Sequence, residues 1–105
     1  MFGDLLGNME ERQKELRRKL AERLVEAEAG DGAVRVTANA NREIVNVSFD
    51  RDKLDWEDVE QVEDLLLAAL NRVLEKAADL ETAETQELLK DMLPPGLGDM
   101  GDLFG

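Results

Sequence analysis

Basic side chains are concentrated at the start of a chain that is otherwise strongly acidic. Residues 1–23 hold six bases and five acids, residues 24–50 hold two and five, and residues 51–105 hold five and fifteen. The whole chain therefore has a net charge of -12. A basic segment attracts the phosphates of nucleic acid, whereas the overall charge opposes non-specific attraction to polyanions. We expect any DNA contact to lie in the N-terminal segment.

The bases of this segment fall into two groups if the segment is helical. At about 100° per residue, Lys19 and Arg23 each lie within about 20° of Arg12, and the other bases form a second sector. An ion-paired helix in water would also carry such residues, because acids are interspersed among the bases. The candidate DNA-contact residues are Arg12, Arg17, Arg18, Lys19 and Arg23.

Catalytic and metal-binding chemistry has little support in the sequence. The chain has no cysteine and no histidine, which excludes disulfides, thiolate nucleophiles and the usual zinc ligand sets. The run Asp50–Asp55 resembles a calcium loop, but Leu54 and Asp55 stand where an EF-hand requires an acid and a glycine. The sequence predicts a non-enzymatic protein with no metal, no other cofactor and no small-molecule substrate.

Length and composition indicate one domain in the cytoplasm. The 105 residues suit a single domain with a modest core, and 43% hydrophobic residues exclude a chain that is disordered throughout. No apolar run approaches the roughly 18 residues that a membrane helix needs. The first residues lack the basic and apolar regions of a signal peptide. We expect one domain over residues 1–105, with no membrane partner.

The first element is predicted to be a helix over residues 5–23. Strong helix formers fill this segment, and no glycine follows Gly7. A narrow apolar stripe runs along it, and this stripe is narrower than the face of a helix that lies on a core. We expect the helix to extend from the body and to pack along a partner helix. The stripe consists of Met9, Leu16, Leu20 and Leu24.

Residues 24–50 change to the two-residue period of β-strands. Three short apolar alternations are separated by Gly30-Asp31-Gly32 and by Asn39-Ala40-Asn41, both suited to tight hairpins. The pattern predicts a three-stranded antiparallel meander with one buried and one wet face. The apolar positions are Val25, Ala27 and Ala29, then Val34, Val36 and Ala38, then Val45, Val47 and Phe49.

A second helix is predicted over residues 56–91, capped by Asp55 and stopped by the Leu-Pro-Pro-Gly of residues 93–96. Its apolar residues cover more surface than one small sheet can bury, and such a surplus usually marks a two-fold interface. The predicted dimer-interface residues are Leu66, Leu70, Val73 and Leu74. We expect the glycine-rich tail over residues 96–105 to be mobile.

Four short strings occur in order along the chain: Met1-Phe2-Gly3, Gly32-Ala33-Val34-Arg35-Val36-Thr37, Glu43-Ile44-Val45-Asn46-Val47 and Leu93-Pro94-Pro95-Gly96. Together they resemble the YbaB/EbfC family of nucleoid-associated DNA-binding proteins. They span nearly the whole chain, and they accompany the charged first helix and the acidic entry into an Ala/Leu-rich second helix. One departure is Asp4, because many relatives carry bases after the opening Met-Phe-Gly.

The resemblance implies an α+β fold, with an α-β-β-β-α subunit that dimerises through the sheet and long-helix region and projects its helices like tweezers. It also implies a nucleoid-associated homodimer that binds double-stranded DNA with little sequence preference, and that helps to organise the nucleoid or to modulate gene expression. The alternative function is an acidic protein–protein adaptor with weak or no DNA binding.

Overall fold

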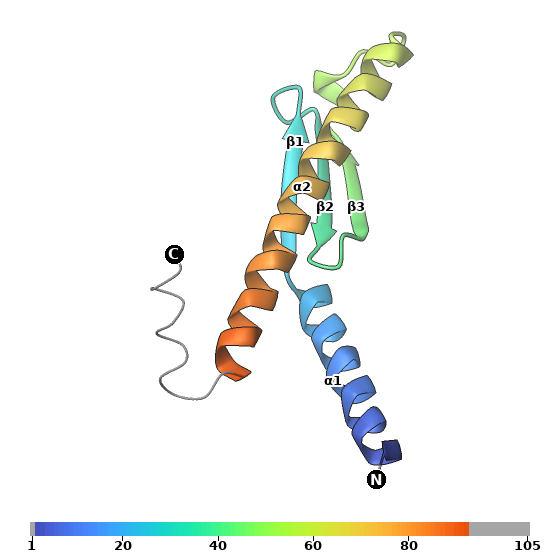
Figure 1. Ribbon diagram of the computed structural model, residues 1–105. Helices are drawn as coiled ribbons and strands as arrows, with labels where there is room; N and C mark the ends of the chain where they lie inside the picture. Colours follow the sequence, from blue (N-terminus) through green and yellow to red (C-terminus); the bar gives the residue numbers. More distant parts are fainter. Residues whose placement is uncertain (1, 93–105) are drawn as a thin grey trace.

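The computed structural model describes the backbone of residues 2–92 and the side chains of residues 6–91. The tail that was expected to be mobile lies outside these residues. Figure 1 shows α2 lying across a sheet, while α1 and the C-terminal part of α2 leave the sheet in diverging directions. The α+β prediction is confirmed. The elements are α1 (Phe2–Glu22), β1 (Leu24–Ala29), β2 (Val34–Asn39), β3 (Ile44–Phe49), the short 3-10 helix η1 (Arg51–Lys53) and α2 (Val59–Met92).

The sheet is the predicted antiparallel meander, in the order β1-β2-β3. In the first turn Gly30, Asp31 and Gly32 all have positive φ, which explains why small and Asx residues occupy it. In the second turn the buried Asn39 carboxamide oxygen accepts hydrogen bonds from the backbone N–H groups of Asn41 and Glu43, at 3.0 and 3.1 Å. Local turn chemistry thus fixes both hairpins.

A β-bulge changes which residues of β3 lie on the same face of the sheet as the core residues of β2. Val47 lies opposite Val36, but Ile44 lies opposite Ala38, so β3 uses one residue more than β2 over this stretch. The expected alternation of Val45 with Val47 is therefore wrong. The extra residue shifts the register, and Ile44 takes the place expected for Val45.

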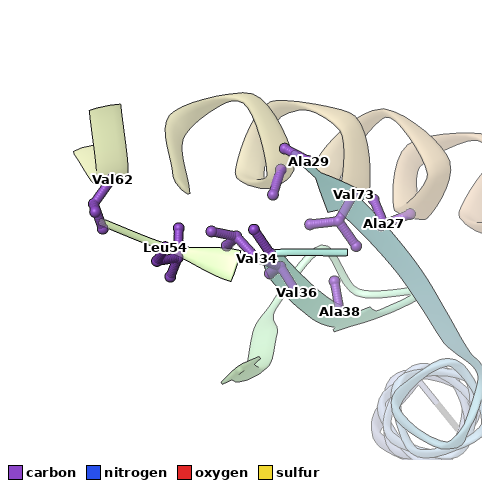
Figure 2. Packing of buried hydrophobic residues seen from close by; sticks show 11 residues of the cluster. Ala27, Ala29, Val34, Val36, Ala38, Leu54, Val62 and Val73 are labelled. Carbon is purple, nitrogen blue, oxygen red and sulfur yellow. The ribbon is translucent and has the colours of Figure 1, made fainter. Parts of the chain in front are cut away.

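The core lies between α2 and the face formed by β1 and β2 (Figure 2). Val34, Val36 and Val73 are completely buried, and Ala69 and Ala77 let α2 approach the sheet closely. The expected buried and wet faces are present in β1 and β2. All six residues of β3 are exposed, however, because α2 does not extend over this strand.

The second helix begins at Val59, three residues later than predicted. Asp55 does not cap it: its carboxylate accepts the Glu57 N–H at 3.0 Å and closes a turn of its own. Asp58 instead accepts the Gln61 N–H at 3.3 Å, at the third helical position. The helix then continues without a break to Met92.

The first helix is attached to the body only near its end. Among the α1 side chains that the structure describes, from Leu6 to Glu22, Leu20 is the buried one, and its carbonyl accepts the N–H groups of Arg23 and Ala40 at 3.2 and 3.1 Å. The Asn41 amide donates to the carbonyl of Arg17 at 2.9 Å. The preceding turns leave the body, as Figure 1 shows.

Candidate nucleic-acid interface

The two helical segments that leave the body carry opposite charge. We call residues 6–23 the α1 arm and residues 79–91 the α2 arm. The α1 arm has six bases and four acids, a net charge of +2, and the α2 arm has one base and five acids, a net charge of -4. Because α1 contacts the body near its C-terminal end, from Arg17 onward, most of its described side chains are exposed. The α1 arm is thus the electropositive projection that the sequence predicted.

A groove of about 450 Å³ separates the two arms. Arg12 and Lys19 line its α1 side, whereas Leu88 and Leu89 line its α2 side. Leu16 also lies in this groove, and Leu16 and Leu20 line a smaller pocket next to it, so this part of the predicted apolar stripe faces the α2 arm of the same chain. Two of the five candidate bases are therefore brought together beside an apolar surface.

Two other candidate bases are engaged in ion pairs. Arg18 lies 3.3 Å from Glu15 and 3.5 Å from Glu22 on its own helix. Arg23 lies 3.0 Å from Glu84 of the α2 arm. All of these groups except Glu84 are more than half exposed, and exposed pairs contribute only about 0–1 kcal/mol. Such pairs are weak enough for a phosphate to displace the carboxylate. The fifth candidate, Arg17, is exposed on α1.

The structure adds one base that the sequence reading missed. Arg42 lies in the β2–β3 turn with a φ of 63°, and its guanidinium is 3.7 Å from Glu81. Glu81 and Glu84 are one turn apart on α2, so Arg42 lies close to Arg23, the partner of Glu84. No local motif marks Arg42, because the tertiary fold alone brings this turn next to the end of α1.

The predicted dimer-interface residues occupy different depths. Val73 is completely buried in the core of its own chain, and Leu66 and Leu70 are half-buried against that core. Leu74 is 36% exposed. At about 100° per residue from Val73, Leu70 and Leu74 lie on one flank of α2, and Arg72 lies on the other.

The flank with the leucines faces the β3 side of the sheet. Arg72 donates a hydrogen bond to the backbone of β1, so the opposite flank of α2 must look toward β3. There Ile44, Val47 and Phe49 are 37–40% exposed. They lie on the same face of the sheet as the β2 residues that α2 buries. Trp56 extends this surface by packing edge-on against Phe49, with ring centroids 5.5 Å apart. The flank of α2 that carries Leu70 and Leu74 therefore lies beside β3, an apolar strand that α2 does not cover.

Neither a metal cluster nor a membrane-spanning helix is found among the residues that the structure describes. No group of three acidic side chains in that part of the chain is arranged to hold a metal ion. No helix there is long and apolar enough to cross a membrane.

Comparison with known proteins identifies the family. The YbaB/EbfC DNA-binding family matches residues 2–92. A nucleoid-associated protein of Moorella thermoacetica is 39% identical over 101 residues, covering 87% of this chain and 97% of that protein. A second, of Pelotomaculum thermopropionicum, is 42% identical over 89 residues and covers 85% of each chain. The crystal structure of the uncharacterized protein HP0035 from Helicobacter pylori superposes with a TM-score of 0.67 at 25% identity, covering 84% of this chain and 92% of that one. The chain therefore belongs to the YbaB/EbfC DNA-binding family and, as the sequence predicted, is not an enzyme.

Proposed function

We propose that the protein is a homodimer that binds double-stranded DNA with little sequence preference and helps to organise the nucleoid or to modulate gene expression. The observation that carries this proposal is the separation of charge between the two arms. Arg12, Arg17, Arg18, Lys19 and Arg23 all lie on the α1 arm of a chain whose net charge is -12. The relatives named nucleoid-associated proteins support a role in the nucleoid.

Contacts from this arm would go to phosphates. Its bases are long, exposed side chains on one helix, and they alternate with acids that disfavour deep entry into a groove of the duplex. Lys and Arg side chains that neutralise phosphates release counterions, and such contacts carry little sequence information. Binding should therefore be weak, strongly salt-dependent and similar for different duplexes.

The dimer surface that we propose is formed by the exposed face of β3 and the adjacent flank of α2. It includes Leu66, Leu70 and Leu74, with Val73 directly beneath them in the core. A second copy fits this surface because an apolar strand and an apolar helix flank, side by side, can each cover the other across a two-fold axis. Six bases in residues 1–23 of each chain then become twelve in the dimer.

The DNA proposal is tested by Arg12→Glu combined with Arg23→Glu. The double reversal should weaken binding at least tenfold, about equally for unrelated duplexes, because the favourable field on the arm is lost. Each lost phosphate contact should also flatten the plot of log affinity against log salt by roughly 0.9. Fluorescence anisotropy with labelled duplexes at two salt concentrations measures both quantities.

The matched control is Arg35→Glu combined with Arg51→Glu, which changes the net charge equally but lies on the body at exposed positions. Affinity should fall clearly less in this control. Equal losses would show that overall charge, not the α1 arm, determines binding. No binding of the wild-type protein to any duplex at low salt would favour the acidic adaptor.

The dimer proposal is tested by Leu70→Asp, which should reduce association and stability together because burying an unpaired carboxylate costs several kcal/mol. Leu74→Asp is the cleaner variant, since this side chain contributes less to the core of its own chain. Light scattering should show a dimeric wild type and a monomeric variant. Leu89→Asp, 57% exposed on the α2 arm, should remain dimeric. A monomeric wild type at micromolar concentration would refute the proposal.

A further inference from the structure

The two edges of the sheet are treated differently by the rest of the chain. β1 and β3 are the edge strands, and each has one side that no other strand of this sheet covers. On β1, Arg72 donates to the carbonyl of Glu28 at 2.8 Å, and Lys76 donates to the carbonyl of Glu26 at 2.9 Å. Both donors come from α2, and both acceptors are backbone groups of an edge strand.

The spacing of helix and strand explains why two consecutive turns of α2 reach these carbonyls. Four residues of a helix rise about 6 Å, and two residues of a strand advance about 6.6–6.8 Å. The spacing of Arg72 and Lys76 along α2 is therefore close to the spacing of Glu28 and Glu26 along β1. The helix and the strand run in opposite directions at this point. Carbonyls two residues apart in a strand point the same way, so these two form the row that another strand would use.

The β3 edge has no such protection. Within residues 6–91, no side chain is hydrogen bonded to the backbone of β3. Its side chains are exposed as well. An unpaired, apolar edge strand is a site for association, whereas an edge occupied by cationic side chains is blocked. The chain is thus open to partners on one edge only.

We propose that Arg72 and Lys76 close the β1 edge against pairing with another strand, so that the protein assembles through its β3 side alone and stops at two chains. The limit of two chains depends on the dimer proposed above. A subunit with two open edges would join neighbours on both sides and form open chains of molecules. These two residues thereby determine which strand of the sheet can receive a partner.

The test replaces both side chains with Met, which keeps an apolar stem of similar length but cannot donate a hydrogen bond. Wild-type protein should give a single species of about twice 11.7 kDa in sedimentation or light scattering. Arg72→Met with Lys76→Met should form larger species that grow with concentration, although the variant is more negatively charged. Lys14→Met with Arg17→Met, which changes the charge equally on the α1 arm, should stay at the wild-type size.

A third substitution distinguishes edge pairing from misfolding. Glu28→Pro removes an N–H from the uncovered side of β1, where a new strand would pair, and prolines are tolerated at such positions. Added to the double Met variant, it should restore the wild-type size. Larger species that persist with Glu28→Pro, or a double Met variant that keeps the wild-type size, would overturn the edge assignment. If the wild type is monomeric, the dimer proposal fails separately, and association of the double Met variant alone would still support a closed β1 edge.

Discussion

The α1 arm and the α2 arm both leave the same small body, but they are built in different ways. The α2 arm continues a helix whose preceding turns are anchored by Val73 and Ala77, which are completely buried. The α1 arm is anchored by Leu20 and by the hydrogen bond from Asn41 to the carbonyl of Arg17. One arm is thus an extension of the core, and the other is attached at one end.

The two arms also differ in charge, and the difference in charge accompanies the difference in attachment. The arm with fewer body contacts carries the bases, and the arm that continues the core helix carries Glu81, Glu84 and Glu87. Arg23 and Arg42 connect the two through Glu84 and Glu81. If DNA binds as proposed, the acids on the α2 arm compete with its phosphates for the bases near the attached end of the α1 arm. Three sets of variants separate attachment from charge.

The largest expected effect is on stability, and it is tested by comparing the variants Val73→Ala and Leu20→Ala. Val73→Ala should lower the free energy of unfolding by roughly 2–3 kcal/mol, because two buried methyl groups are lost and a cavity remains. Leu20→Ala should mainly release α1, so amide hydrogen exchange should accelerate over the α1 arm while the sheet stays protected. Denaturant unfolding and residue-resolved exchange measure the two effects. Equal loss of protection in all elements of both variants would show that α1 is not independent of the core.

A smaller effect, about tenfold in DNA affinity at low salt, should follow from neutralising the α2 arm. Removing its acids reduces repulsion of phosphate near the bases of α1. The control neutralises four exposed acids at the start of α2 and in the turn before it, which lie away from the arms. Stronger binding in the control than in the arm variant would contradict the comparison. The arm variant is Glu81→Gln, Glu84→Gln, Glu87→Gln and Asp91→Asn, and the control is Glu57→Gln, Glu60→Gln, Glu63→Gln and Asp64→Asn.

The smallest expected effect is a difference in DNA affinity between single substitutions of two acids on the α2 arm. Glu84→Gln frees Arg23, whereas Glu87→Gln makes the same change of charge one turn away. Because Arg23 is more than half exposed and such ion pairs contribute about 0–1 kcal/mol, Glu84→Gln should raise DNA affinity by about two- to fivefold, and Glu87→Gln by less. Anisotropy titrations in parallel resolve this difference. Equal gains would mean that the Arg23–Glu84 pair does not restrict Arg23.

Most of the element order could be predicted because it depends on local patterns. The two-residue period placed Ala27, Val34 and Val36 on the buried face of a meander, and the Asx and glycine turns occur where they were expected. The sequence predicts a start of α2 that is three residues too early, because Asp55 and Asp58 are both good capping residues. Only the geometry of the turn before the helix selects Asp58.

The candidate interface was predicted only in part. The charge of the α1 arm follows from counting residues, but its neighbours in space do not. Arg42 is separated from Arg23 by most of the sheet in sequence, and both reach the same helix in the fold. Val73 and Leu74 are adjacent in sequence, yet one is completely buried and the other is 36% exposed.

The sequence by itself determined the helices, the strands, the turns and the location of the positive charge, because hydrophobic period, turn residues and charge act over a few residues. The tertiary structure decided which flank of α2 faces β3, which edge of the sheet is closed and which bases are paired with acids. A bulge of one residue in β3 and the position of α2 over β1 and β2 settle these points. They depend on contacts such as Lys76 with Glu26, 50 residues apart, which no local pattern encodes.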